Sequence, residues 1–179
     1  MPERPAGLSL RLRAFLWDYP ILAAYLALVV GAGAAFQAWL PHVAHHVFGS
    51  AGSGQFHAFL VVTLPIGLYF ALFERSRWQA TPGKRRMRLR VEVEGRDRPR
   101  LGLARSLGRT ALKLLPWELA HACIWQVRFA PPEAQALVSA GFVLVWVLVG
   151  ANAWSLLADP ARRTLYDRVL GTRVVTVAG

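Results

Sequence analysis

The sequence is poor in acidic residues and contains a single cysteine. It has 10 Asp and Glu against 21 Lys and Arg, which gives a formal net charge of +11. Cys123 has no second cysteine to pair with, so an internal disulfide framework and a thiolate metal site are excluded. We also find no nucleophile paired with a base, no metal triad and no cofactor fingerprint. We therefore expect no enzyme activity and no cofactor.

A nucleotide-binding loop is also absent. Thr81, Pro82, Gly83 and Lys84 place a lysine after a glycine, but a phosphate loop also needs an earlier glycine and a Ser or Thr after the lysine. We instead interpret Pro-Gly as a turn and expect Lys84 to contact lipid phosphates or a carboxylate such as Asp167. A pI near 11.3 would suit nucleic acid, but basic residues that flank apolar segments favour anionic lipid headgroups as the partner.

Apolar residues are abundant: they make up 55% of the chain, and its mean hydropathy is +0.34. Four segments reach or nearly reach the length of a helix that crosses about 30 Å of hydrocarbon. These segments are residues 15–40, 56–73, 114–129 and 134–158. The third is weaker, because Glu118, His121 and Arg128 interrupt it and Pro116 is expected to kink it. The pattern predicts an all-α membrane protein, one domain over residues 1–179 with a four-helix transmembrane bundle.

The positions of the basic residues predict how the chain is oriented. Of the 21 Lys and Arg, 3 precede the first segment, 13 lie in the loop 75–113 and 4 follow the last segment. Only Arg128 falls on the opposite side when all four segments span. Because cytoplasmic loops retain Lys and Arg, both termini and the basic loop 75–113 are expected in the cytoplasm.

Within the basic loop, two patterns predict local structure. Apolar and charged residues alternate over 87–94, which is typical of a half-buried strand, and a second strand-like run covers 173–177. The two runs are expected to pair as a small cytoplasmic ribbon. Beyond Pro99 the period becomes helical, and a stripe formed by Arg105, Arg109 and Lys113 predicts a basic amphipathic helix lying against anionic headgroups.

An ordered set of short motifs along nearly the whole chain resembles the RDD family of bacterial membrane proteins. The motifs are Arg11 with Ala14 and Asp18, Thr81 to Arg85 followed by Leu89 to Val91, Arg109, and Thr164 to Arg168 followed by Gly171 to Val175. The arginine and two aspartates that name the family map onto Arg11, Asp18 and Asp167. The resemblance implies a multi-pass protein of the bacterial inner membrane, with transport suspected and cation/proton exchange proposed for some members. Pro20, which follows Asp18 by two residues, departs from the family pattern.

Two interpretations of Asp18 are open. In the structural one, Asp18 forms an ion pair or is the N-cap of a helix with Pro20 in its first turn, and as a cap it would leave residues 11–17 as a separate surface helix. In the functional one, the helix is continuous, Arg11 and Asp18 lie seven residues apart on one face, and Asp18 is an ion-coupled carboxylate. For Asp167 we expect a structural clasp that pairs with Lys84, Arg85 or Arg109.

Other polar residues lie in or near the apolar segments. Glu118 and His121 share a helix face and form either a proton relay or a locally satisfied pair near a membrane end. Three histidines, His42, His45 and His46, could converge on zinc or copper, but no carboxylate or thiolate accompanies them. We expect a solvated, pH-responsive loop and no metal.

The sequence therefore favours a small transporter or cation/proton exchange component. A homo-oligomer is expected, because four short spans leave little room for a sealed pathway in one protomer. The alternative is a non-catalytic scaffold or accessory subunit that binds anionic lipid and a membrane partner protein through the basic loop. Nucleic acid is not an expected partner.

Overall fold

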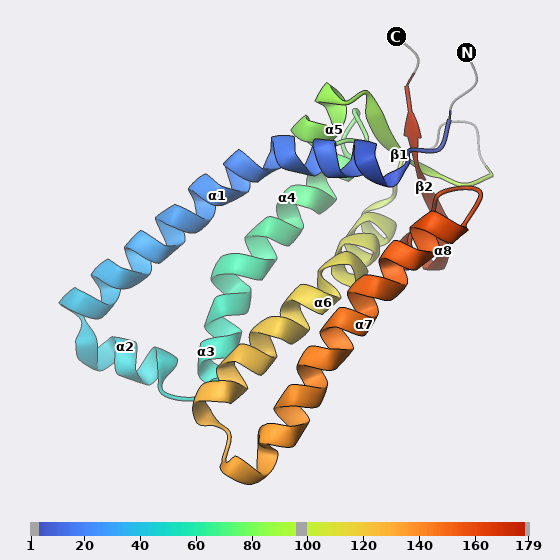
Figure 1. Ribbon diagram of the computed structural model, residues 1–179. Helices are drawn as coiled ribbons and strands as arrows, with labels where there is room; N and C mark the ends of the chain where they lie inside the picture. The colour runs from blue at the N-terminus through green and yellow to red at the C-terminus, as the bar shows by residue number, and fades with distance from the viewer. Residues whose placement is uncertain (1–3, 96–99, 178–179) are drawn as a thin grey trace. The chain divides into compact units, whose positions relative to one another are not determined.

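The computed structural model describes residues 4–95 and 100–177, so residues 96–99 of the predicted basic loop and the ends of the chain lie outside the described residues. The described chain is mostly helical (Figure 1). Its elements are α1 (Leu8–Trp39), α2 (Pro41–Phe48), α3 (Ala51–Ala58), the π-helix η1 (Phe59–Thr63), α4 (Leu64–Arg75), α5 (Pro82–Arg86), β1 (Leu89–Val93), α6 (Leu103–Phe129), the 3-10 helix η2 (Pro132–Ala134), α7 (Gln135–Ala158), α8 (Leu165–Val169) and β2 (Thr172–Thr176).

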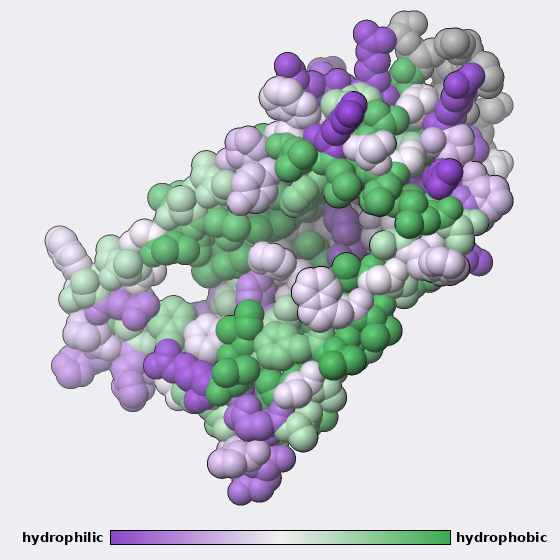
Figure 2. All heavy atoms as spheres, viewed as in Figure 1, coloured by the Kyte–Doolittle hydropathy of each residue, from purple (hydrophilic) through white to green (hydrophobic). Residues whose placement is uncertain are grey.

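Three helical runs in the described residues are long and apolar enough to cross a membrane. They are Leu8–Trp39, Ala51–Arg75 and Pro132–Ala158, and they correspond to three of the four predicted spans. Large apolar side chains project from them into the surroundings: Val30 is 71% exposed and Trp146 is 74% exposed. Figure 2 shows hydrophobic side chains along α1 and α7 on the face in view. An apolar surface of this extent indicates contact with lipid, because soluble monomers rarely expose large contiguous apolar patches.

The remaining predicted span, 114–129, is the second part of α6. This helix is continuous from Leu103 to Phe129 with Pro116 inside it, and it is not among the three helices that are apolar enough to span. The four-helix bundle therefore stays a prediction. The helix predicted beyond Pro99 is present, but residues 103–113 form the first turns of α6 and not a separate helix against the headgroups. Arg109 is 1% exposed there, and carboxylates neutralise it in place of lipid phosphates.

The chain folds into two compact units. The first, which we call the ion-pair unit, consists of Met1–Ile21, Gly67–Lys113 and Val149–Gly179; the second, the apolar unit, consists of Leu22–Ile66 and Leu114–Leu148. All contacts described below lie within one unit or the other. A single domain over residues 1–179 stays a prediction.

The predicted pairing of the two strands is confirmed: they form a two-stranded antiparallel sheet in the ion-pair unit, and its cytoplasmic location stays a prediction. Val91 of β1 lies opposite Val174 of β2, and the second strand begins one residue earlier than the sequence pattern indicated. The N-terminal segment adds to the other edge of β2, because the Ala6 N–H donates to the Val174 carbonyl at 2.9 Å. Apolar side chains of the strands and of α1 form a buried core, which includes Ala14 and Leu89.

Helix α1 runs through Asp18 and Pro20 without a break. The N-cap interpretation of Asp18 and the separate surface helix over 11–17 are therefore wrong. Pro20 removes only one backbone hydrogen bond, the one that its missing N–H would give to the Leu16 carbonyl. The Asp18 carboxylate does not cap α1, because donors from elsewhere in the ion-pair unit occupy it.

Candidate functional site

Asp18 is buried at 2% exposure and accepts three hydrogen bonds. The donors are the Tyr69 hydroxyl at 2.9 Å, the Thr81 hydroxyl at 2.5 Å and the Gly83 backbone N–H at 2.7 Å. Thr81 is the N-cap of α5, and Pro82 follows it at the first helical position. Asp18 therefore binds at the N-terminus of α5, where the free N–H groups favour a carboxylate.

Gly83 allows α5 to approach α1 closely. A Cβ atom at this position would lie 2.0 Å from the Ala14 carbonyl oxygen and 2.9 Å from the Asp18 carboxyl group. The Thr-Pro-Gly-Lys motif thus combines a helix cap, a preorganised first turn and a backbone contact. The motif starts α5, and the Gly83 N–H donates to Asp18.

The ion-pair unit also contains a chain of buried charges, which we call the buried ion cluster. Its members are Arg11, Glu74, Lys84, Arg109, Lys113 and Asp167. Arg109 is central: its Nη1 donates to Glu74 Oε2, and its Nε donates to Asp167 Oδ1 at 2.9 Å. Glu74 also pairs with Lys84 and, at 3.5 Å, with Lys113. Buried charges of this kind are tolerated only when each one is paired.

Asp167 is fully buried and pairs with two arginines of the buried ion cluster, Arg11 and Arg109. Its Oδ2 accepts from Arg11 Nη1 at 2.9 Å, and the Thr172 hydroxyl donates to its Oδ1 at 2.9 Å. Thr164 and Asp167 form a reciprocal capping box at the start of α8. Burial alone would raise the pKa of Asp167, but the positive charges of Arg109 and Arg11 outweigh it and hold the pKa below its usual range. Asp167 is therefore ionised at neutral pH.

Lys84 contacts a different carboxylate from the one that the sequence suggested. Its Nζ pairs with Glu74, and no ion pair joins it to Asp167 in the described part of the chain. Burial lowers the pKa of Lys84, and the charge of Glu74 opposes that effect. The neighbouring arginines lie on tryptophan rings: Arg85 Cζ is 4.1 Å from the centre of the Trp78 ring, and Arg86 Cζ is 3.9 Å from that of Trp17.

The apolar unit has a second polar cluster, centred on Glu118 of α6. Glu118 accepts hydrogen bonds from the Gln55 amide and, at 2.6 Å, from the Thr63 hydroxyl. Within the described residues, no Lys or Arg lies within ion-pair distance of Glu118. Thr63 is the last residue of the π-helix η1, and the Val61 carbonyl within η1 accepts from the Tyr25 hydroxyl at 2.5 Å. Short π-helical turns often occur at functional sites.

His121 lies one turn from Glu118 on α6, and no hydrogen bond between the two is observed in the described chain. Its Nδ1 atom is buried without a hydrogen-bond partner, and its ring meets the Trp117 ring edge-on at a centre distance of 4.7 Å. An unpaired imidazole nitrogen can accept or donate a proton. The hydrogen bonds from Gln55 and Thr63 join α6 to α3 and η1. The spacing of Glu118 and His121 along the sequence could not reveal these partners.

The histidines of α2 do not form a metal site in the described residues. No group of three or more His, Cys, Asp or Glu side chains is arranged to hold a metal ion there. The rings of His45 and His46 lie 6.2 Å apart at 64°.

Comparisons with known proteins place the chain in a family. The sequence profile of the RDD family matches residues 5–171, nearly the whole chain. The chain belongs to the RDD family. No curated protein and no solved structure is similar enough to match. Family membership together with the apolar helices identifies a membrane protein.

The structure brings the RDD motif residues together in two places of the ion-pair unit. Arg11, Arg109 and Asp167 meet in the buried ion cluster, and Asp18 meets the Thr81 and Gly83 end of α5. The motif residues thus connect segments that are distant in the sequence. In both places the motif carboxylate accepts several hydrogen bonds.

Sequence reasoning missed several partners of the RDD motif residues. Glu74, which the sequence patterns did not single out, is fully buried and contacts three cations. The missed signal is that Glu74 is a lone acid directly after a long uncharged segment. Thr164 could have been found from its spacing to Asp167, which matches a capping box. Tyr69, Gln55 and Thr63 gave no such signal.

Proposed function

We propose that this RDD protein is a small transporter or cation/proton exchange component of the bacterial plasma membrane, in which Glu118 is the ion-binding carboxylate. It is a multi-pass protein with both termini in the cytoplasm, and it is not an enzyme. The distribution of basic residues supports this orientation. The observation that carries the proposal is that two neutral donors, Gln55 and Thr63, hold Glu118 in the apolar unit with no Lys or Arg partner in the described chain.

A carboxylate without a fixed cation has two ways to avoid the cost of an unpaired charge in an apolar environment. It takes up a proton, or it binds a mobile cation. The Thr63 hydroxyl suits both states, since it donates to an ionised Glu118 and accepts from a protonated one. Reversible binding at Glu118 is the step that an exchanger needs.

The carboxylates of the ion-pair unit are less suited to that role. Asp18 accepts three hydrogen bonds, and Asp167 is locked between Arg11 and Arg109. Releasing and rebinding an ion at either position would leave several buried donors unsatisfied. We therefore assign structural roles to Asp18 and Asp167. His121, one turn from Glu118 and with a free buried nitrogen, is the candidate to pass a proton onward.

Flux measurements in proteoliposomes test this function. The purified protein should move protons against Na⁺ or K⁺ when a pH or cation gradient is imposed, and Glu118→Gln should abolish this flux. The matched control is Glu133→Gln, because Glu133 is an exposed carboxylate of the same unit. Normal flux in Glu118→Gln, or flux that only Asp18→Asn removes, would rule out Glu118 as the carrier.

The second candidate is a non-catalytic scaffold or accessory subunit that binds anionic lipid and a membrane partner protein. The observation that favours it is the pair of exposed tryptophans, Trp17 and Trp78, with arginine side chains over their rings. Aromatic rings and basic groups together are typical of the headgroup level of a membrane. A protein that gives no flux but pulls down a partner, and loses it in Arg85→Gln with Arg86→Gln, fits this function. Cross-linking in membranes tests the expected homo-oligomer.

A further inference from the structure

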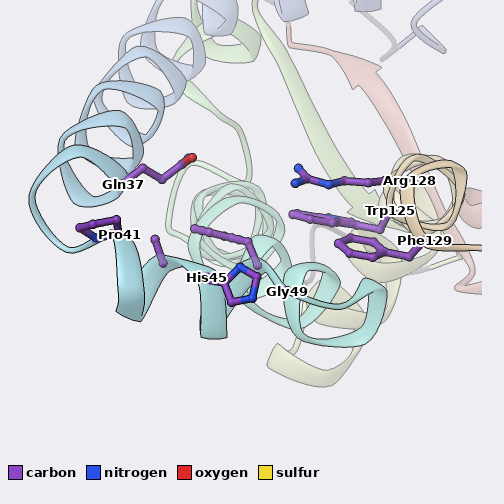
Figure 3. Close-up of a pocket in the computed structure, with 9 residues that line it drawn as sticks. Gln37, Pro41, His45, Gly49, Trp125, Arg128 and Phe129 are labelled. Carbon is purple, nitrogen blue, oxygen red and sulfur yellow. The ribbon is translucent and has the colours of Figure 1, made fainter.

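The apolar unit contains a cavity that neither polar cluster uses. It has a volume of about 420 Å³ and lies between α1, α2 and α6 (Figure 3). This volume falls within the range of about 300–1,000 Å³ that small-molecule sites have. The side chains that define its chemistry are Gln37, His45, Phe48, Trp125, Arg128 and Phe129.

Arg128 has a charge that no residue described by the structure neutralises. Its guanidinium group lies over the Phe129 ring at 5.4 Å from the ring centre, and none of the described carboxylates forms an ion pair with it. In Figure 3 the guanidinium group and the Gln37 side chain point toward one another across the cavity. Arg128 is also the one basic residue outside the three basic segments of the sequence, on the side where Lys and Arg are disfavoured.

Flat aromatic rings form the apolar part of the wall. The ring planes of Phe48 and Trp125 are within 5° of parallel at a centre distance of 6.1 Å, and those of Trp125 and Phe129 are within 18° at 6.4 Å. Parallel rings of this kind offer flat faces and edges to a planar apolar group. A fixed cation at one end and aromatic surface beside it are complementary to an anion with an apolar body.

We propose that this cavity binds an organic anion, a carboxylate or phosphate group joined to a planar apolar body. Arg128 holds the anionic group through paired N–H donors, and the Gln37 amide adds a further donor. The rings of Trp125 and Phe129 contact the apolar body. The anion is either a soluble molecule or the headgroup of an anionic lipid. The inference concerns binding alone and does not depend on ion transport by Glu118.

A binding titration on the full chain in phosphatidylcholine nanodiscs tests the site, with indole-3-carboxylate and its neutral amide as probes. The acid should bind saturably and about tenfold more tightly than the amide, which corresponds to one charge-assisted interaction. Arg128→Gln should remove this difference in affinity, and Arg128→Lys should keep part of it. Trp125→Leu should weaken the binding of both probes. Arg13→Gln is the matched control, because Arg13 is an exposed arginine of the ion-pair unit.

The same titration in phosphatidylglycerol nanodiscs separates the two sources of the anion. Unchanged binding of indole-3-carboxylate supports a soluble anion, and loss of binding through competition supports a lipid headgroup. Equal affinity for acid and amide in the wild type would overturn the proposal. So would full discrimination in a monodisperse, folded Arg128→Gln variant. Folding is expected to survive this change, since Arg128 is exposed and its guanidinium group forms no ion pair with the described residues.

Discussion

The two units of this RDD protein treat charged side chains in opposite ways. In the ion-pair unit, Glu74, Arg109 and Asp167 are fully or almost fully buried, and each contacts at least one group of opposite charge. In the apolar unit, Glu118 and Arg128 have no counter-ion among the described residues. A charge with fixed partners holds segments together, whereas a charge without one is available to a mobile ligand. From this difference we propose a stabilising role for the first unit and a binding role for the second.

The largest effect is expected when the centre of the buried ion cluster is removed. Arg109→Gln takes away the cation that Glu74 and Asp167 share. Breaking a buried ion pair from one side costs about 3–5 kcal/mol, because the remaining charge is left uncompensated. The loss should appear as a lower midpoint of thermal unfolding in detergent micelles.

Two further variants sharpen this prediction. Arg13→Gln removes an exposed arginine from the same unit and should leave the midpoint nearly unchanged. Combining Arg109→Gln with Glu74→Gln should cost less than the sum of the two single changes, because each removes the partner that the other leaves unpaired. Strict additivity would show that Arg109 and Glu74 do not act as a pair.

A smaller effect is expected at the contact between α1 and α5. Gly83→Ala would place a methyl group 2.0 Å from the Ala14 carbonyl, so the two helices must move apart. Overpacking of this kind costs about 1–3 kcal/mol. The matched control is Gly102→Ala, since a Cβ at Gly102 meets no atom within 4 Å. Comparing the unfolding midpoints of the two variants measures the effect, and equal midpoints would contradict the close approach.

The elements that come from a regular or uniform sequence pattern could be predicted from the sequence. The alternation over 87–94 located β1, and long uncharged segments located three candidate spans. Both are local patterns that short stretches of sequence determine. The continuity of α6 could not be predicted, because the sequence suggested that Arg109 and Lys113 would face lipid phosphates. The pairing of Arg109 with Glu74 depends on tertiary packing.

The candidate sites were predictable to a similar extent. The motif identified Arg11, Asp18 and Asp167, but not what each of them contacts. For Asp18, a proline two residues later favoured a cap on its own helix, but its hydrogen-bond donors are Thr81 and Gly83 from a distant segment. For Glu118, the structure placed Gln55 and Thr63 beside it, two residues from a different segment of the apolar unit. Neutral hydrogen-bond partners leave no charge pattern in a sequence.

A pH-dependent effect is expected from Asp167. Its folded-state pKa lies below the usual value of 3.8, so its contribution to stability is fully present above that value and is lost as the pH falls through the folded-state pKa. Asp167→Asn should therefore lower the unfolding midpoint by a constant amount above about pH 5. The difference from wild type should shrink on acidification below pH 3.8. A difference that does not change with pH would show that Asp167 contributes through shape and not through charge.

The smallest effect on stability is expected at Glu118, where the comparison between the two units can be tested most directly. Glu118→Gln keeps an oxygen that accepts a hydrogen bond from Thr63. The Gln55 Oε1 atom is buried without a hydrogen-bond partner, and the new amide group can donate to it once the Gln55 side chain rotates. The change also removes a charge that has no fixed cation. We expect the free energy of unfolding to change by less than about 1 kcal/mol.

Glu74→Gln is the matched variant, because it makes the same chemical change inside the buried ion cluster. It leaves Lys84, Arg109 and Lys113 without their shared carboxylate and should cost about 3–5 kcal/mol. Thermal unfolding of both variants under identical conditions gives the comparison. If Glu118→Gln were as destabilising as Glu74→Gln, Glu118 would have to be a fixed structural charge, and a carboxylate that cannot release its partner cannot carry an ion.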